Sequence, residues 1–460
     1  MSKACATETA VLHVLDEVVA SARRQKVAEF DAYAICTRTR RVTIERELVS
    51  SADSIMATGL HVRVCVDGKV GGASCNEFDR RATSECIDHA VRIANLMESD
   101  KNWSGFPSSS KKYPSVSGLY DTSVASLDVP VMSMMAEEMI DGARSVSKDV
   151  SAPYGAVEST GRTVGVTNSS GMRSVMSETE LQALICCVAG SGESISPDCE
   201  ESGQSRSCDL RIDKIGERAG WIAEKSTHIL DAKTEECDVV FSPMSLGAGN
   251  DGLLNVVLSE AFSGQNTHQG ISFLAGRLGE PIWSEHVTIN DNPLLSGRCG
   301  SRPFDDEGIA AQKTRLVNKG TLVGYVWDSY HGSISGEGST GNAIRDLSSG
   351  TVGAAPLCLQ VMPDRGSMKS LIESVDHGYL VWGCQGSHTS NTETGGFSFV
   401  ASPGLLIKNG EVVGGVRGSM VSGNVTDLMK NVERVGADVV DFGSALMPSI
   451  LFRNVKITTG

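Results

Sequence analysis

The sequence contains no long apolar segment. Nowhere do 18 apolar residues follow one another, and the first ten residues, MSKACATETA, lack the continuous apolar stretch of a signal peptide. We therefore expect a cytoplasmic protein that is neither exported nor embedded in a membrane.

Positive charge is also scarce. The chain has 41 Lys and Arg against 56 Asp and Glu, which gives a net charge of −15, and it has no run of five basic residues. This balance repels nucleic acid phosphates and acidic lipid headgroups. It argues against direct binding to nucleic acid or to a membrane surface.

Several common functional motifs are missing. The 13 cysteines are scattered without a CxxC pair, so we expect most of them to be reduced core residues. No GxSxG turn and no Walker loop occurs. The segment from Gly336 to Gly341 matches GxGxxG, but no βαβ pattern surrounds it and no apolar helix follows it. Nucleotide binding is therefore not expected.

The first hundred residues show helical and strand periodicities in turn. Apolar residues at helical spacing predict helices over 7–23 and 79–97, the second with Ile93 on its inner face. Alternating patterns predict strands at 29–36, 41–48 and 60–66, and Asp67-Gly68 predicts a hairpin turn after the last of them. The opening unit is a helix, an antiparallel sheet and a second helix.

A change of composition divides the chain further. Residues 101–126 are rich in Ser, Pro, Gly and Lys and are typical of an exposed connector. Helices near 130–146 and 211–230 then flank strands at 162–168 and 178–189, and from Cys237 short strands alternate with frequent glycine. We predict an α+β fold with an α/β sandwich-like N-terminal region in two segments, 1–105 and 106–236, and a β-rich C-terminal domain, 237–460. Helices in that domain are expected at 253–262 and 427–435.

Several spaced stretches carry a family resemblance. They are the hairpin GLHVRVCVDGKVGGAS (59–74), LLNVVLSEAFSGQNTHQGISFLAGRLG (253–279), RPFDDEG (302–308), STGNA (339–343), GGFSF (395–399), LIKNG (406–410) and GNVTDLMKNVERVGAD (423–438). In this order they resemble the TldD/PmbA family over nearly the whole chain.

The resemblance also locates a departure from the family pattern. Active TldD-type members are similar to zinc peptidases, with HExxxH on a helix and a cysteine near the C-terminus as metal ligands. Here the motif reads SEAFSG from Ser259 to Gly264, so of its catalytic residues only Glu260 is present, and Ser444 stands in the region where the cysteine is expected. Zinc requires donors such as imidazole and thiolate. We therefore expect a vestigial site without metal and without catalytic residues.

This departure resembles the PmbA (TldE) branch, whose members form a heteromeric complex with a metal-bearing TldD subunit. The implied role is a subunit that shapes the chamber for unfolded or modified peptides, with zinc only in a TldD-like partner. Family members are often labelled modulators of DNA gyrase. We expect an oligomer, with such a partner or with itself, formed mainly through the C-terminal domain and assisted by the N-terminal one.

Other interpretations remain open for particular residues. Glu260, His268 and His388 are candidates for lining the chamber, although a structural role for Glu260 and a plain loop position for both histidines are the simpler readings. His388 lies near Cys384 and could belong to a nucleophile or metal pair, which would make the chain an independently active (metallo)peptidase. A regulatory binding protein is the third possibility. The acidic run Asp305–Glu307 is expected to form a solvated turn.

Overall fold

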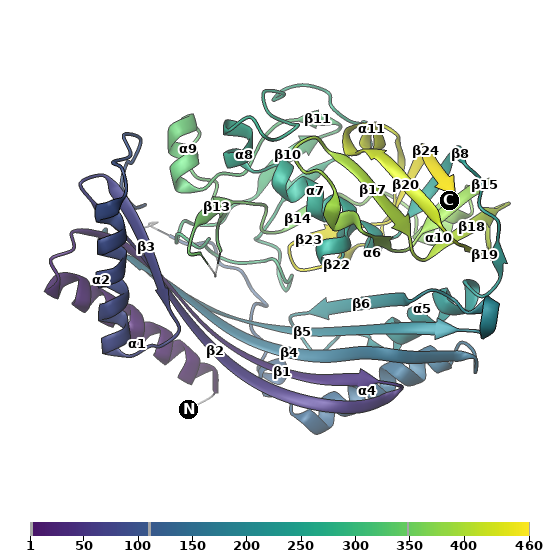
Figure 1. The fold of residues 1–460 in the computed structure, drawn as a ribbon, viewed down its shortest axis with the longest axis horizontal. Coiled ribbons are helices and arrows are strands. Elements are labelled where there is room, and N and C mark those ends of the chain that lie inside the picture. Colours follow the sequence, from purple (N-terminus) through teal and green to yellow (C-terminus); the bar gives the residue numbers. More distant parts are fainter. Residues whose placement is uncertain (1–2, 109–111, 347–348, 460) are drawn as a thin grey trace.

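The computed structural model describes residues 3–108, 112–346 and 349–459. It confirms the predicted α+β fold, with an N-terminal sheet and a C-terminal domain stacked on it (Figure 1). Residues 109–111 of the predicted connector lie outside the described residues. In the described parts of the chain, no helix combines the length and apolar character needed to cross a membrane.

A six-stranded antiparallel sheet forms the base of the molecule, in the order β3-β2-β1-β4-β5-β6. The predicted boundary at 105 falls in the connection between helices α2 and α3, and strands from both sides of it join this one sheet. The strands are β1 (Glu29–Glu45), β2 (Leu48–Val66), β3 (Lys69–Cys75), β4 (Val150–Asn168), β5 (Arg173–Ala189) and β6 (Cys199–Ser205).

The strand β1 corrects one prediction. The sequence predicts separate strands at 29–36 and 41–48, but a single strand runs through the polar residues between them. Thr37 and Arg40 pair with Ala57 and Ser54 of β2 in an unbroken register. Polar side chains interrupt an apolar pattern without interrupting backbone pairing. The hairpin predicted at Asp67-Gly68 is confirmed, and both residues have positive φ, as a tight hairpin turn requires.

Two pairs of helices cover one face of this sheet. Alternate residues of β1 point to them: Phe30, Ala32 and Ala34 pack in the cluster formed with α1 and α2, and Val42 and Ile44 in the cluster formed with α4 and α5. The prediction that Ile93 of α2 points inward is wrong, because its side chain is 40% exposed at the outer face. The helices are α1 (Lys3–Arg24), α2 (Arg80–Leu96), α3 (Thr122–Ser126), α4 (Val129–Arg144) and α5 (Ile212–Lys225).

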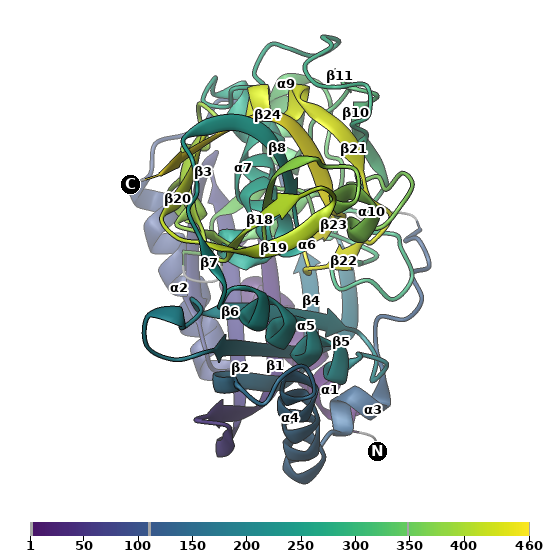
Figure 2. The ribbon, with the colours of Figure 1, turned by 90° about the vertical axis from the view of Figure 1, so that its right-hand side faces the viewer.

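The C-terminal domain packs on the face of the sheet opposite α4 (Figure 2), and α5 touches it at the end of the sheet, where the ring centroids of Trp221 and Trp382 lie 6.3 Å apart. Its largest sheet has ten strands, in the order β16-β17-β20-β24-β8-β15-β18-β19-β7, with β21 added beside β24. The bounds are β7 (Ile229–Leu230), β8 (Glu235–Phe241), β15 (His377–Val381), β16 (Cys384–Gln385), β17 (Gly396–Ala401), β18 (Gly404–Lys408), β19 (Glu411–Val416), β20 (Ser419–Asn424), β21 (Val432–Val435) and β24 (Ile450–Thr459).

Two smaller sheets and short helices complete the domain. A six-stranded sheet has the order β11-β10-β9-β14-β23-β22, and β12 pairs with β13. These strands are β9 (Ile289–Asp291), β10 (Thr314–Asn318), β11 (Thr321–Leu322), β12 (Ala343–Arg345), β13 (Val352–Ala354), β14 (Leu359–Val361), β22 (Val440–Asp441) and β23 (Ala445–Met447). The helices are α6 (Pro243–Gly247), α7 (Leu253–Ala261), α8 (Gly264–His268), α9 (Ser329–Ser335), α10 (Met368–Ile372) and α11 (Val425–Lys430).

The helix predicted at 427–435 is only partly present. Helix α11 ends at Lys430, and Val432–Val435 forms strand β21, paired with β24. A bulge between Val432 and Arg434 shifts the strand register, so Val432 and Val435 are both buried at a spacing of three. That spacing imitates a helix, which explains the wrong prediction.

The acidic run Asp305–Glu307 is buried, so the predicted solvated turn is wrong. Asp305 accepts backbone N–H groups from Glu307, Ile309 and Ala343 at 2.8–3.0 Å. Burial, together with the charge of Glu307, raises the pKa of Asp305 to about 8. The three acidic residues therefore organise the contact between the C-terminal domain and the sheet.

Charged residues from both parts meet at this contact. Arg63 of β2 binds Asp31 of β1 and lies 2.9 Å from a carboxylate oxygen of Glu307. Arg345 donates to Asp31 at 2.9 Å from the other side. Burial opposes ionisation of Asp31, but the charges of Arg345 and Arg63 lower its pKa to about 2. A network of buried ion pairs thus joins the two parts of the molecule.

Candidate functional site

The predicted vestigial motif is divided between two helices. Helix α7 buries Leu254, Val257 and Leu258 in the core of the C-terminal domain, which leaves Ser259 half-buried and Glu260 exposed on its other sides. The helix ends at Ala261, and Gly264 begins the separate short helix α8. The motif therefore does not occupy one continuous helix.

Two of the predicted positions meet at a third residue. Ser259 of α7 and Ser444, which precedes β23, each place their hydroxyl oxygen 3.4 Å from the amide oxygen of Asn255. The Asn255 amide nitrogen donates in turn to the carbonyl of Gly249 at 3.3 Å. The structure thus brings Ser259 and Ser444 together around a neutral amide, and Asn255 is a site residue that the sequence analysis missed.

The third predicted position has no space for a side chain. A Cβ atom at Gly264 would lie 2.2 Å from Cε3 of Trp327, far inside van der Waals contact. The Gly264 N–H donates to the carbonyl of Val326 at 2.7 Å, which holds the backbone against this indole. An imidazole at this position would require Trp327 to move.

These residues do not fit a zinc ion. Two hydroxyls, one amide and a glycine replace the imidazole and thiolate donors on which protein zinc sites depend. Among the residues that the structure describes, no group of three or more His, Cys, Asp and Glu side chains is arranged to hold a metal ion.

The three candidate chamber-lining residues are all exposed. Glu260 is exposed and accepts a hydrogen bond of 2.8 Å from the side chain of Asn266. His268 is exposed at the end of α8. His388 is also exposed, and its Nδ1 atom lies 3.0 Å from a carboxylate oxygen of Asp251.

The alternative pair of Cys384 and His388 has no geometry for nucleophilic catalysis. The Cys384 thiol is buried and donates to the carbonyl of Ser245 at 3.3 Å. Burial raises the pKa of this thiol well above its ordinary value, so the reactive thiolate is disfavoured. The hydrogen-bond partner of His388 is Asp251 rather than Cys384.

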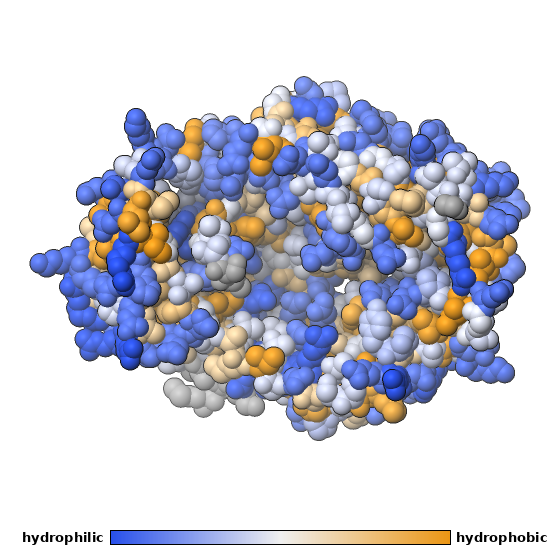
Figure 3. Space-filling model, viewed as in Figure 1, coloured by the Kyte–Doolittle hydropathy of each residue, from blue (hydrophilic) through white to orange (hydrophobic). Residues whose placement is uncertain are grey.

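A cavity of about 720 Å³ lies between the base sheet and the C-terminal domain. Alternate residues of neighbouring strands form its lower wall, among them Tyr154, Glu158, Gln182, Leu184, Glu200 and Ser202. The upper wall consists of Met244 and the segments 248–251, 382–385 and 402–403. On the face seen in Figure 3, a hollow between the two parts is bordered mostly by hydrophilic residues.

The cavity lies beside the vestigial site. Its upper wall includes Gly249 and Asp251, the short turn that leads into α7. Gly249 accepts the hydrogen bond from Asn255, which also contacts Ser259. The sequence offered no sign of this cavity, because its walls come from segments that are distant along the chain.

Comparisons with known proteins agree with this geometry. Residues 31–94 match the PmbA/TldA metallopeptidase domain 1, and residues 234–459 match the PmbA/TldA metallopeptidase C-terminal domain. An uncharacterized protein of Methanocaldococcus jannaschii is 30% identical over 90% of this chain and 92% of its own length. A protein of Methanothermobacter thermautotrophicus named metalloprotease is 28% identical over 90% of this chain and 89% of its own length.

A solved structure extends the similarity to the whole fold. The crystal structure of TldE from Thermococcus kodakarensis superposes with a TM-score of 0.88 at 27% identity, covering 97% of this chain and 99% of that chain. The predicted resemblance is confirmed: the chain belongs to the TldD/PmbA family of metallopeptidase-related proteins.

Proposed function

We propose that this chain is a metal-free, TldE-like subunit of a cytoplasmic TldD-type metalloprotease complex, in which it helps to enclose unfolded or modified peptides. The observation that carries the proposal is the composition of the vestigial site. Ser259 and Ser444 face a neutral amide, and Trp327 fills the space beside Gly264. The similarity to TldE from Thermococcus kodakarensis supports the same assignment.

In this proposal the chemistry belongs to the partner. A TldD-like chain would supply the zinc ion, which activates a water molecule for attack on a peptide carbonyl. This chain would supply walls that exclude water and hold the peptide. The residues that line its cavity between the sheet and the C-terminal domain would form part of these walls. Glu260 has no metal-bound water to deprotonate and would not act as a general base.

The edge of the base sheet supports an assembled state. Strand β3 pairs with β2 only from Leu60 to Val66, so within the described chain the outer edge of β2 from Leu48 to Thr58 pairs with no other strand. Leu48, Ile55 and Met56 on this segment are 55–70% exposed. Long exposed strand edges with apolar side chains are rarely left uncovered in stable proteins.

Light scattering tests the proposal directly. The chain is measured alone and mixed with a TldD-like chain from the same source. We expect a particle larger than one chain of 48.6 kDa, with roughly 1,200 Å² or more of total buried surface, the lower range for stable complexes. Activity on an unfolded peptide should appear only when the TldD-like chain is present.

A matched pair of variants locates the contact. Ile55→Lys adds a charge to the free edge of β2, whereas Leu96→Lys adds one at an exposed position on α2. Weaker assembly for Ile55→Lys alone supports the edge as part of the interface. A strictly monomeric particle in both samples would overturn the subunit proposal and favour a regulatory binding protein.

A further inference from the structure

The cavity between the base sheet and the C-terminal domain has an unbalanced charge. Among the described residues, four carboxylates line it, those of Glu158, Asp198, Glu200 and Asp251, whereas the only lysine or arginine in its lining is Arg41. Arg41 lies directly opposite Glu158 in the pairing of β1 with β4, so it offsets that carboxylate first. The charges of Asp198, Glu200 and Asp251 remain.

Two of these carboxylates contact side chains other than lysine and arginine. Glu200 accepts a bond from the hydroxyl of Tyr154, and Asp251 contacts Nδ1 of His388 at 3.0 Å. Tyrosine is a neutral donor, so its hydrogen bond leaves the negative charge of Glu200 in place. Within the described residues, no lysine or arginine forms an ion pair with Asp198, Glu200 or Asp251.

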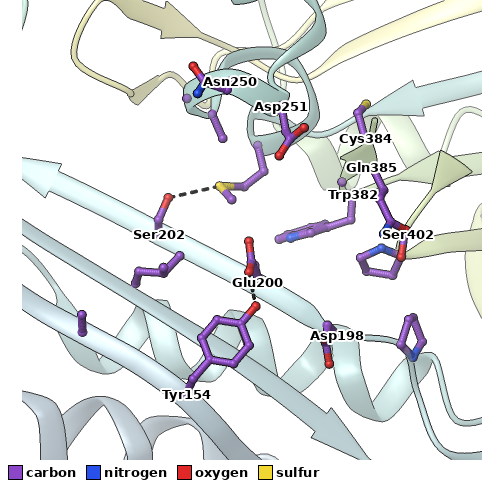
Figure 4. Close-up of a pocket in the computed structure, with 18 of the residues that line it drawn as sticks. Tyr154, Asp198, Glu200, Ser202, Asn250, Asp251, Trp382, Cys384, Gln385 and Ser402 are labelled. Carbon is purple, nitrogen blue, oxygen red and sulfur yellow. Dashed lines mark hydrogen bonds between the residues drawn. The ribbon is translucent and has the colours of Figure 1, made fainter. Parts of the chain in front are cut away.

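The side chains converge on the centre of the cavity from both walls. In Figure 4 the carboxylate of Glu200 points up from β6, that of Asp251 points down from the turn before α7, and the indole of Trp382 lies beside the space between them. Like charges that face each other across a partly enclosed space repel, and a cation between them relieves that repulsion. The arrangement therefore favours a positively charged ligand.

The remaining lining indicates what carries the positive charge. Met244, Leu184 and Pro403 add apolar surface to the same cavity. An aliphatic stem with a cationic end, as in lysine and arginine side chains, covers such a surface while its charge reaches the carboxylates. The volume of about 720 Å³ suits a short peptide segment.

We propose that this cavity binds the ammonium or guanidinium group of a lysine or arginine side chain in a peptide, held between Glu200 and Asp251. This inference rests on the proposed function, because it requires that peptides reach the cavity. It adds to the proposed function a preference of this metal-free subunit for peptide segments that contain lysine or arginine. Asp251 ends the short turn that leads into α7, so a peptide bound here lies next to the vestigial site.

Peptide binding to the isolated full chain tests the inference. The probes are short capped peptides of Gly and Ser with a fluorescent label and one central lysine, arginine or acetyl-lysine. Acetyl-lysine keeps the stem but lacks the charge. We expect the lysine and arginine peptides to bind about tenfold more tightly than the acetyl-lysine peptide, as charge-assisted contacts to carboxylates allow.

Variants separate this cavity from the general negative charge of the protein. Glu200→Gln and Asp251→Asn should each weaken binding of the charged peptides about threefold to tenfold, and leave the acetyl-lysine peptide unchanged. Glu411→Gln removes an exposed carboxylate outside the cavity and should have no effect. Circular dichroism confirms that each variant is folded.

Three results would overturn the inference: equal affinity for the lysine and acetyl-lysine peptides, no measurable binding of any of them, or equal losses for Glu411→Gln and Glu200→Gln. The assay needs no partner chain. Its failure therefore leaves the assembly measurements of the proposed function intact, and a monomeric chain that binds basic peptides would contradict only the subunit role.

Discussion

Ser259 and Ser444 contact the same acceptor, the amide oxygen of Asn255, each at 3.4 Å. The two serines come from the start and the end of the C-terminal domain, in the regions where the resemblance to TldD-type members implies a histidine and a cysteine. Their meeting is consistent with one shared site formed by the two ends of the domain. It also shows that neutral hydrogen bonds hold these positions together in this chain.

The packing of Trp327 against Gly264 leads to a stability prediction. Gly264→Ala should lower the free energy of unfolding by about 1–3 kcal/mol, because the added methyl group overlaps the indole. Urea denaturation measures the change. Gly161→Ala is the matched control, since no atom lies within 4 Å of a Cβ at that position of β4. Equal stability of the two variants would show that the indole moves freely and that an imidazole could be accommodated.

The donor set around Asn255 leads to a metal prediction. The purified chain should retain less than about a tenth of an equivalent of zinc after dialysis, as measured by elemental analysis, because fewer than three suitable ligands converge. Ser259→His with Ser444→Cys should not restore stoichiometric binding, since Gly264 still supplies no third ligand. Tightly held zinc that is lost on substitution of His268 or His388 would instead support an independently active metallopeptidase.

Several residues of this site could be predicted from the sequence, because the prediction depends only on which residue type stands at each position of the motif. The expectation of a vestigial site at Ser259, Gly264 and Ser444 needed no coordinates, and it stays a prediction. Asn255 could also have been found, since it lies one helical turn before Ser259 on the same face of α7. Trp327 could not, because its contact with Gly264 depends on how two distant segments pack.

The fold shows the same division between local and long-range information. The turn at Asp67-Gly68 and the helices of the base sheet follow from local patterns. Asp305–Glu307 was misjudged because its environment includes Arg63 and Arg345, which the sequence alone does not place beside it. Adjacent acids in a turn are normally solvated, and only the docking of the C-terminal domain on the sheet buries these.

Glu260 provides a test of the non-catalytic role. Glu260→Ala removes an exposed carboxylate and its hydrogen bond with Asn266, so it should change the free energy of unfolding by no more than about 1 kcal/mol. Peptide cleavage by a complex with a TldD-like partner should fall by less than about threefold. A thousandfold loss of cleavage with unchanged assembly would show that Glu260 takes part in the chemistry.

The buried ion pairs between the sheet and the C-terminal domain should be essential for stability. Asp31→Asn leaves Arg63 and Arg345 without their shared partner and should cost about 3–5 kcal/mol at pH 7. Urea denaturation gives the difference from the unsubstituted chain. Asp427→Asn, at an exposed site on α11, should have almost no effect.

The pKa of Asp31 also predicts how the effect of this substitution on the free energy of unfolding depends on pH. The pKa of Asp31 is about 2 in the folded protein and about 3.9 in an unfolded chain, so the unfolded state binds the proton more readily between these values. The contribution of the ionised carboxylate, about 2.6 kcal/mol, is therefore complete above about pH 5 and decreases as pH falls towards about 2. The stability difference between the unsubstituted chain and Asp31→Asn should shrink over this range. A difference that stays constant from pH 7 to the lowest pH at which the protein remains folded would mean that Asp31 contributes through packing rather than through its charge.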